Sequence, residues 1–268
     1  MRNHLYVDGK DLADFGVYVS GQGTFKSPQK EVTFYDVPGR PGALLGASSR
    51  LANVDVTYPA FISENVRVNM RDLRSYLLSR DGYVEIRDTY NTDETRLGVY
   101  TGALDPQMTP KHDAGEFDLT FNCKPQRWFT SGNTMIEVLK AASPYTITNP
   151  THFNCQPLLR VYFTGAFAVN LKNPSGVNEY MIASPQNLTS LGYSYIDIDC
   201  ETMHAWNGND VLDGYMWWEP GVRKPNVYTP VLVPGTNTVE LPSTFVISSV
   251  TITNKATKVD VTPRWWEV

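Results

Sequence analysis

Cysteine is scarce in this sequence. Only Cys123, Cys155 and Cys200 occur among 268 residues, and they are widely spaced. An odd number of cysteines at such spacing forms neither a disulfide framework nor a zinc-binding pattern. We therefore expect reduced, partly buried thiols in a protein that is made in a cytosol. No apolar run approaches the roughly 18 residues of a membrane helix, and residues 1–6 lack the apolar core of a secretory signal.

Motifs of the common enzyme classes are also missing. The glycines in residues 21–23 lack the third glycine of a dinucleotide fingerprint, and those in residues 39–42 are not followed by the Lys-Ser/Thr of a P-loop. No nucleophile elbow and no His-Glu-x-x-His motif occurs. Cys200 and His204 come nearest to a metal-binding pair, but no further ligand lies close in sequence. The sequence therefore predicts no enzyme, no cofactor and no metal site.

Positive charge is too sparse to indicate nucleic-acid binding. The chain carries 23 basic and 28 acidic side chains, a net charge of −5. Residues 1–130 hold 15 of the basic and 17 of the acidic ones, so residues 131–268 keep only 8 and 11. No polybasic run is present, which argues against binding through phosphate neutralisation.

Turn-forming and aromatic residues are abundant. The chain has 19 Gly, 18 Pro, 15 Tyr and 6 Trp, and 41% of its residues are hydrophobic. This composition is typical of many short strands joined by tight turns around a real core. We predict a mainly β protein with two β-sandwich-type domains, residues 1–135 and 136–268. The boundary falls where the charge density drops.

The first domain is predicted to contain a long hairpin or loop. Residues 31–37 and 54–58 alternate as strands, whereas residues 38–46 hold two prolines and three glycines, too many for a regular element. Leu44 and Leu45 lie in this loop, and exposed leucines there need a partner. Further along, residues 116–122 alternate as a strand that we expect to stop at Lys124-Pro125.

One helix is predicted, over residues 65–79, with Ser63 as its N-cap. Its apolar stripe follows the helical spacing i, i+4, i+7 and i+11 and consists of Val66, Met70, Leu73 and Leu77. Its other faces carry Arg67, Arg71 and Arg74. These arginines form either a basic groove or an ordinary solvated helix surface.

The second domain is predicted to be built from strands alone. About eight are indicated, at residues 158–164, 166–171, 179–183, 191–200, 211–215, 238–241, 245–253 and 258–261. The dipeptide Asn207-Gly208 favours a hairpin turn. Asp197, Asp199 and Glu201 fall on one strand face. They are interpreted as the polar face of a half-exposed strand, with a calcium site and a glycosidase pair as alternatives.

Three tryptophans are candidates for sugar contact. Trp206, Trp217 and Trp218 occur near several tyrosines and near Asn and Asp side chains, the combination that a saccharide site needs. Because Trp217 and Trp218 are adjacent, a strand would point them to opposite faces, so we expect one of them to belong to the core.

Several segments together resemble the distal tail proteins of long-tailed (siphovirus-type) bacteriophages. In the first half these are LYVDGKDLADFGVYVSGQGTF, DVPGRPGALL and FDLTFNCKPQRW. In the second half they are IDIDCETMHAWNG, VLVPGTN after a proline, and VDVTPRWWEV. Their order and spacing match over nearly the whole chain, although each motif by itself consists only of turns and aromatics.

The resemblance implies a structural component of a phage tail tip or baseplate. Its first domains are expected to form a ring of six copies that joins the tail tube to tip or receptor-binding proteins in the virion. Its second domain is expected to be galectin-like. An acidic balance suits a lumen through which DNA passes without binding. The alternative functions are a carbohydrate-binding adhesion module and, third, a glycosidase.

The predicted subunit contact is in the glycine- and proline-rich loop, because stiff prolines and permissive glycines let it cross a boundary. Sheet edges in the first domain also favour pairing with a neighbouring copy. The expected interface residues are Pro38, Gly39, Arg40, Gly42, Leu44 and Leu45.

Overall fold

The protein is described by a computed structural model that covers residues 2–21, 25–46, 50–63, 65–111, 113–173, 178–220 and 229–268. The chain is mainly β and folds as two units, Met1–Trp128 and Phe129–Glu267. The division therefore falls earlier than residue 135. The expected stop at Lys124-Pro125 is wrong, because strand β10 (Gly115–Phe129) continues through it.

Within the residues described, the first unit contains ten strands, two helical segments and one long hairpin. The strands are β1 (Leu5–Val7), β2 (Lys10–Asp11), β3 (Val17–Val19), β4 (Phe34–Asp36), β5 (Ala43–Leu45), β6 (Val54–Ile62), β7 (Val84–Asp88), β8 (Glu94–Tyr100), β9 (Gln107–Met108) and β10. The helical segments are the 3-10 turn η1 (Leu12–Phe15) and helix α1 (Val66–Leu78).

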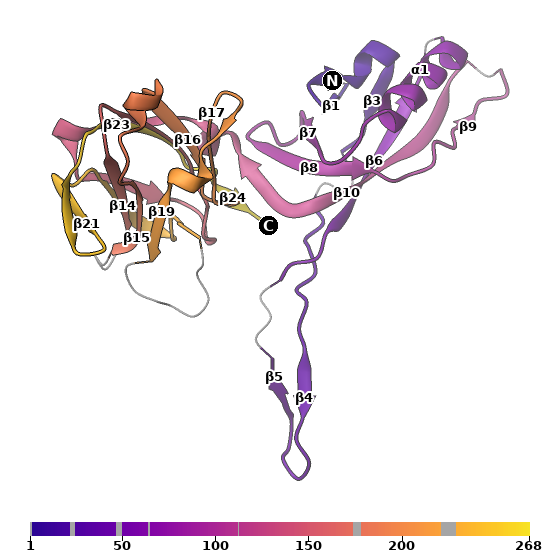
Figure 1. Ribbon diagram of the computed structural model, residues 1–268. Helices are drawn as coiled ribbons and strands as arrows, with labels where there is room; N and C mark the ends of the chain where they lie inside the picture. Colours follow the sequence, from indigo (N-terminus) through magenta and orange to yellow (C-terminus); the bar gives the residue numbers. More distant parts are fainter. Residues whose placement is uncertain are drawn as a thin grey trace. The chain divides into compact units, whose positions relative to one another are not determined.

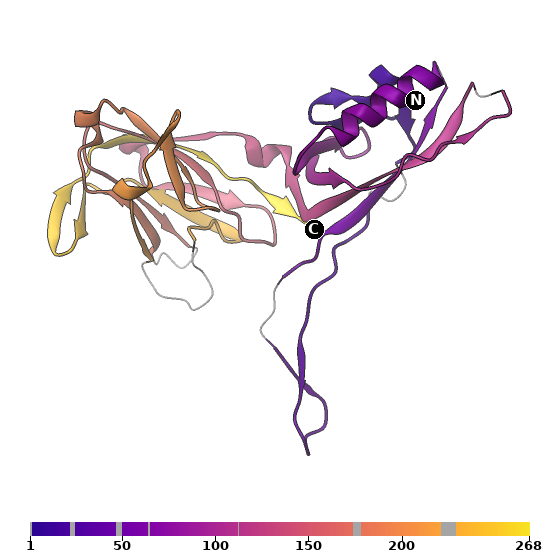
Figure 2. The same ribbon diagram turned by 45° about the vertical axis from the view of Figure 1, so that its right-hand side comes forward.

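A single sheet organises the first unit. Its strand order is β2-β1-β7-β8-β10-β6-β3, and β9 pairs with the start of β10. Along β10 the buried side chains Phe117, Leu119 and Phe121 alternate with the outward Glu116 and Asp118. Helix α1 and η1, rather than a second sheet, cover the apolar face (Figures 1 and 2). The opposite sheet face is therefore open to solvent and rich in polar groups.

Helix α1 forms where its apolar periodicity predicted it. All four stripe residues, including Leu73, are buried against the sheet. The expected N-cap is wrong, because Asn65 rather than Ser63 precedes the first turn. Asn65 has a left-handed backbone (φ 45°) and its side chain makes no capping hydrogen bond. Its carbonyl accepts the N–H groups of Val68 and Asn69 and so starts the helix.

The loop between β3 and β6 forms a two-stranded hairpin, which we call the arm (residues 26–52, described at 26–46 and 50–52). Strands β4 and β5 pair only with each other, and the arm projects from the sheet of the first unit (Figure 1). Residues 38–46 are not wholly irregular as expected, since Ala43–Leu45 is a strand. Positive φ angles at Gly39 and Gly42 complete the turn before that strand begins.

The second unit contains fourteen strands and four 3-10 turns within the residues described. The strands are β11 (Ile136–Leu139), β12 (Tyr145–Asn149), β13 (Leu158–Phe163), β14 (Phe167–Lys172), β15 (Asn178–Ser184), β16 (Tyr195–Asp199), β17 (His204–Asn207), β18 (Asp210–Val211), β19 (Trp217–Pro220), β20 (Gly235–Glu240), β21 (Thr244–Ile247), β22 (Val250–Thr253), β23 (Ala256–Thr262) and β24 (Trp266–Glu267). The turns are η2 (Thr130–Asn133), η3 (Lys140–Ala142), η4 (Leu188–Leu191) and η5 (Asp213–Tyr215).

Two sheets make a sandwich in the second unit. One has the order β11-β23-β13-β16-β17-β18 and the other β12-β20-β14-β15-β19. Their inner faces enclose one apolar core that includes Val161, Phe167 and Ile198. Gly132 in η2 lies against the backbone of Trp265, where an added Cβ would come within 2.3 Å of the Trp265 nitrogen. This glycine is therefore required by close packing.

Three expected strand assignments and one turn in the second unit need correction. Residues 191–200 contain strand only in β16 (Tyr195–Asp199), because Leu191 is the end of η4. Residues 211–215 form the end of β18 and the turn η5 rather than one strand. Residues 245–253 are a hairpin, because Ser248 and Ser249 reverse the chain with φ angles of 49° and 69°. The predicted Asn207-Gly208 turn lies one residue later, since Asn207 still pairs with Asp210. Local sequence signals located the reversals only approximately.

Within the described parts of both units, no helix is long and apolar enough to cross a membrane.

Candidate functional site

The arm exposes several large apolar side chains of the first unit. Phe34 pairs with Leu45, and the two side chains are 66% and 71% exposed. The next pair, Tyr35 and Leu44, lies on the other face because side chains alternate along a strand. Both faces of the arm therefore present an apolar cross-strand pair. A two-stranded hairpin is marginally stable by itself, and exposed apolar groups of this size indicate a binding surface.

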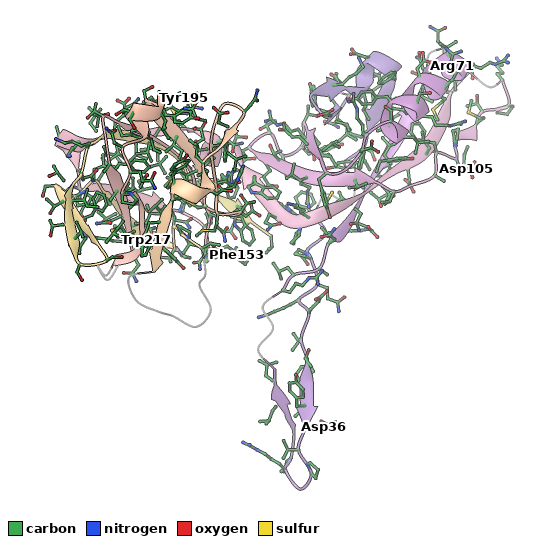
Figure 3. The ribbon with its side chains drawn as sticks, in the orientation of Figure 1. Asp36, Arg71, Asp105, Phe153, Tyr195 and Trp217 are labelled. Atoms are coloured by element: carbon green, nitrogen blue, oxygen red, sulfur yellow. The ribbon has the colours of Figure 1, made fainter. Side chains whose placement is uncertain are left out.

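The other predicted interface residues form the turn of the same hairpin. Pro38 and Gly39 lead to Arg40, whose backbone N–H donates to the Val37 carbonyl at 3.1 Å. Arg40 is exposed, and its side chain has no ion-pair partner among the residues described. Figure 3 shows Asp36 near the end of the arm, next to this turn. The structure thus brings the six predicted residues together on one projecting hairpin.

Two grooves of opposite charge lie on the first unit. An acidic groove of about 570 Å³ is lined by Asp105, Glu116 and Asp118 around a floor that includes Phe61. A basic groove of about 380 Å³ is lined by the three helix arginines with Met70, Pro106 and Met108. In Figure 3, Arg71 and Asp105 mark these surfaces.

The arginines of the basic groove do not behave alike. The Nε atom of Arg71 lies 2.9 Å from a carboxylate oxygen of its neighbour Asp72, in an exposed ion pair. Such a pair contributes little stability. Arg67 and Arg74 have no ion-pair partner within the described part of the chain. The structure thus contains features of both interpretations of these arginines. They lie on a solvated helix surface, and they also line a basic groove.

The carboxylates of β16 are held by arginines. Arg160 on β13 donates two hydrogen bonds to Asp197, at 2.6 and 2.9 Å, and these bonds raise the pKa of Arg160. Arg264 donates to Asp199 at 2.9 and 3.4 Å and lies 3.9 Å from Glu201. Paired, bidentate contacts fix both aspartates in place. The expectation of three carboxylates on one half-exposed strand face is wrong in part, because Glu201 lies in the turn after β16 and Asp197 is buried. The two aspartates are ion-pair partners of arginines within the fold.

The pair Cys200 and His204 does not form a joint site. Cys200 is fully buried in the core of the second unit, and burial raises the pKa of its thiol. His204 instead directs Nδ1 to Asp213 at 2.9 Å, and Asp213 also accepts the Ala205 N–H. Among the residues described, no group of three or more His, Cys, Asp or Glu side chains is arranged to hold a metal.

The remaining cysteines are also free and buried. Burial raises the pKa of Cys123 to about 11 and raises that of Cys155 as well. Since the thiolate is the reactive form of cysteine, burial disfavours the reactive form of all three thiols.

Two of the candidate sugar residues, Trp206 and Trp217, lie on different sheets. Trp206 lies on β17, in the six-stranded sheet, where its ring stacks on His204 with centroids 5.3 Å apart. Together they border a shallow cavity of about 300 Å³ that also contains Asn209. Trp217 lies on β19 of the other sheet and is 42% exposed; Figure 3 labels it. The Trp218 side chain lies outside the described part of the structure.

Sequence reasoning missed several residues of these surfaces. Arg160 and Arg264 were not predicted, because their partners are far away in sequence. The alternation of Arg160 with apolar neighbours in β13 was a signal for the first of them. The acidic groove was also missed, because Asp105 and the β10 carboxylates meet only through strand pairing. The aromatic members of the arm, Phe34 and Tyr35, could have been found from their place beside the predicted turn.

Comparison with known proteins gives matches only at the level of structure. No family model matches the sequence, and no curated protein matches it. A chain of the phage P2 baseplate, in its activated conformation with Ca, is similar over 97% of this chain and 98% of that chain, with a TM-score of 0.51 and 13% identity. The chain therefore has the fold of a phage baseplate protein.

A second solved structure identifies the particular fold. The crystal structure of Dit (gp 19.1) of phage SPP1 matches over 100% of both chains, with a TM-score of 0.68 and 15% identity. That protein is described as a paradigm of the hub adsorption apparatus in phages that infect Gram-positive bacteria. The sequence resemblance to distal tail proteins is thus confirmed in the fold of the whole chain.

Proposed function

We propose that this protein is a structural subunit of a phage tail tip. Its copies form a ring that joins the tail tube to tip or receptor-binding proteins, and the family resemblance implies six copies in that ring. The observation that carries this proposal is the match of fold over the entire length of SPP1 Dit. Because the match includes both units and their order, it extends beyond a common β-sandwich.

The arm supplies the physical reason for assembly. Its apolar pairs are solvent-exposed in the single chain, and burial against a second copy would remove that apolar area from water. A contact between two different surfaces repeats head to tail and closes when the rotation per copy divides a full turn. The six loop residues identified from the sequence are the proposed contact, with Leu44 and Leu45 at its centre.

The test is made on assembled tails. Density for tails that contain this chain should show six copies at the distal end of the tube, with Leu44 and Leu45 at a boundary between copies. The double variant Leu44→Ser, Leu45→Ser should be incorporated poorly. The matched control Val246→Ser, Val250→Ser removes similarly exposed apolar groups from β21 and β22 and should be incorporated normally. Absence of the protein from the tail tip would refute the proposal.

Carbohydrate binding is a second candidate function, favoured by the cavity beside Trp206. An aromatic ring next to Asn209 and His204 offers stacking and hydrogen bonding in one place. A glycan array or a cell-wall pull-down with the whole protein tests it. Binding that is lost in Trp206→Ala but kept in Trp217→Ala would support this site, and absence of binding by the natural chain would refute it.

We further propose that the protein is not a glycosidase. Asp197 and Asp199 are each engaged by an arginine, which leaves neither free as a proton donor. Replacing both by Asn should leave tail activity intact apart from any loss of folding. Hydrolysis of cell-wall polysaccharide by the natural protein, abolished in this double variant, would contradict the proposal.

A further inference from the structure

The acidic groove of the first unit has the features of a protein-binding surface. Asp105, Glu116 and Asp118 are exposed, and none of them has an ion-pair partner among the residues described. Arg2 stands over the Tyr18 ring, 4.8 Å from its centroid, and lies 6.0 Å from the centroid of the Phe61 ring. Three unneutralised carboxylates around an apolar floor match a partner that presents both a cation and apolar side chains.

The arm presents that combination. It carries four basic side chains and two acidic ones. Three of the basic ones, Lys26, Lys30 and Arg40, have no ion-pair partner within the described residues, whereas Arg50 lies 3.6 Å from Glu31. Arg40 lies in the turn, three residues before Ala43, the first residue of the strand that carries Leu45. The arm therefore places a free cation close to its most exposed leucine.

Resting on the proposed function, we infer that the arm of one copy binds the acidic groove of the next copy, with Leu45 against the apolar floor and Arg40 beside the carboxylates. Both surfaces belong to the first unit, and in the single chain neither covers the other, since arm and groove carboxylates are all exposed. Charge complementarity also selects this groove over the basic one, because the arm and the helix arginines have the same sign.

This contact differs from a simple apolar association. The arm and the groove are different surfaces, so each copy uses its arm on one neighbour and its groove on the other. Such a heterologous contact generates a ring or an open filament. The opposite charges fix which surface the arm enters, because placing like charges together opposes the wrong pairing.

Disulfide trapping tests the placement of the arm. One full-length protein carries Leu45→Cys, and a second, distinguished by a size tag, carries Ala103→Cys at the exposed rim of the acidic groove. The natural cysteines are buried and do not compete. Oxidation of the mixture should give a cross-linked product of mixed size. As matched control, Arg71→Cys in the basic groove should give little product with Leu45→Cys.

A charge exchange tests the pairing itself. In the trapping pair, Arg40→Glu in the arm or Asp118→Lys in the groove should each lower the cross-linked fraction by about tenfold, which corresponds to about 1.4 kcal/mol. Combining Arg40→Glu arms with Asp118→Lys grooves should restore the yield. Both side chains are exposed, so neither change disturbs the core.

Several results would overturn the inference. The first is that Leu45→Cys forms as much cross-linked product with Arg71→Cys as with Ala103→Cys. The second is that it forms no product with Ala103→Cys. The third is that combining the two charge exchanges does not restore the cross-linked yield. The proposed function is judged separately, by the presence of the protein at the tail tip. A ring found there with the arm elsewhere would refute this placement and leave the tail function standing.

Discussion

Replacing Leu73 by Ala tests whether helix α1 holds the first unit together. Leu73 is fully buried between the helix and the sheet. The substitution removes three carbon groups, each worth about 0.8 kcal/mol of transfer free energy. The cavity left behind adds about 24 cal/mol per Å³. We expect a loss of about 3 kcal/mol in the free energy of unfolding, within a range of about 2–5 kcal/mol.

Leu78→Ala is the matched control. It makes the same chemical change on the same helix, but Leu78 is 65% exposed. Little transfer free energy is lost there, and alanine favours the helix slightly, so the cost should stay below about 1 kcal/mol. The comparison cancels effects that any leucine-to-alanine change in this helix would have.

The assay must separate the two units, because a chain with two units need not unfold in one step. Hydrogen exchange measured by mass spectrometry in increasing urea reports each unit through its own amides. Leu73→Ala should lower the stability of β6 and β10 and leave β13 unchanged. A loss below about 0.5 kcal/mol, or a loss equal to that of Leu78→Ala, would show that the stripe is not core.

Three further predictions concern the second unit. Gly132→Ala should lower the free energy of unfolding by about 1–3 kcal/mol in denaturant melts, because its Cβ would meet backbone. The control Gly214→Ala has open space around the added Cβ and should cost little. Equal effects of the two substitutions would contradict the packing argument. Ser249→Gly should stabilise by about 0.5 kcal/mol, since relief of its positive φ outweighs the greater chain entropy of glycine; a loss in thermal melts would refute this. Burial raises the pKa of Glu240, but hydrogen bonds, first that from Lys172, outweigh burial and lower it below the usual 4.5. This lowered pKa stabilises the fold above pH 4.5, and the contribution disappears as the pH falls through the folded-state pKa. Glu240→Gln should cost about 1 kcal/mol at pH 7 and reduce the loss between pH 7 and pH 3; an unchanged pH profile would refute it.

Local sequence pattern determined the elements whose partners lie close in the chain. The stripe through Leu73 specified α1 because helical spacing alone brings those side chains to one face. The segment around Gly39 and Gly42 specified a chain reversal, since positive φ angles favour glycine. The presence of a projecting hairpin with Leu44 and Leu45 could therefore be predicted without coordinates.

Tertiary structure decided the features that depend on pairing between distant segments. Asp197 is a charged residue in any strand prediction, but only the register of β13 against β16 brings Arg160 beside it. The stop expected at Pro125 also failed, because β10 continues to Phe129, six residues beyond its last pair with β6 at Cys123. Strand identity is local, whereas strand partners are chosen by the burial of a whole face.

The two grooves separate what local sequence determines from what the tertiary structure determines. The helix arginines could be read as a cluster from their spacing, since all three belong to one element. The acidic groove could not be found this way, because Asp105 precedes β9 whereas Asp118 lies within β10. The sequence by itself thus determined which side chains were available for contact. The folded sheet alone decided which of them share a surface, because side chains distant in sequence become neighbours only through strand pairing.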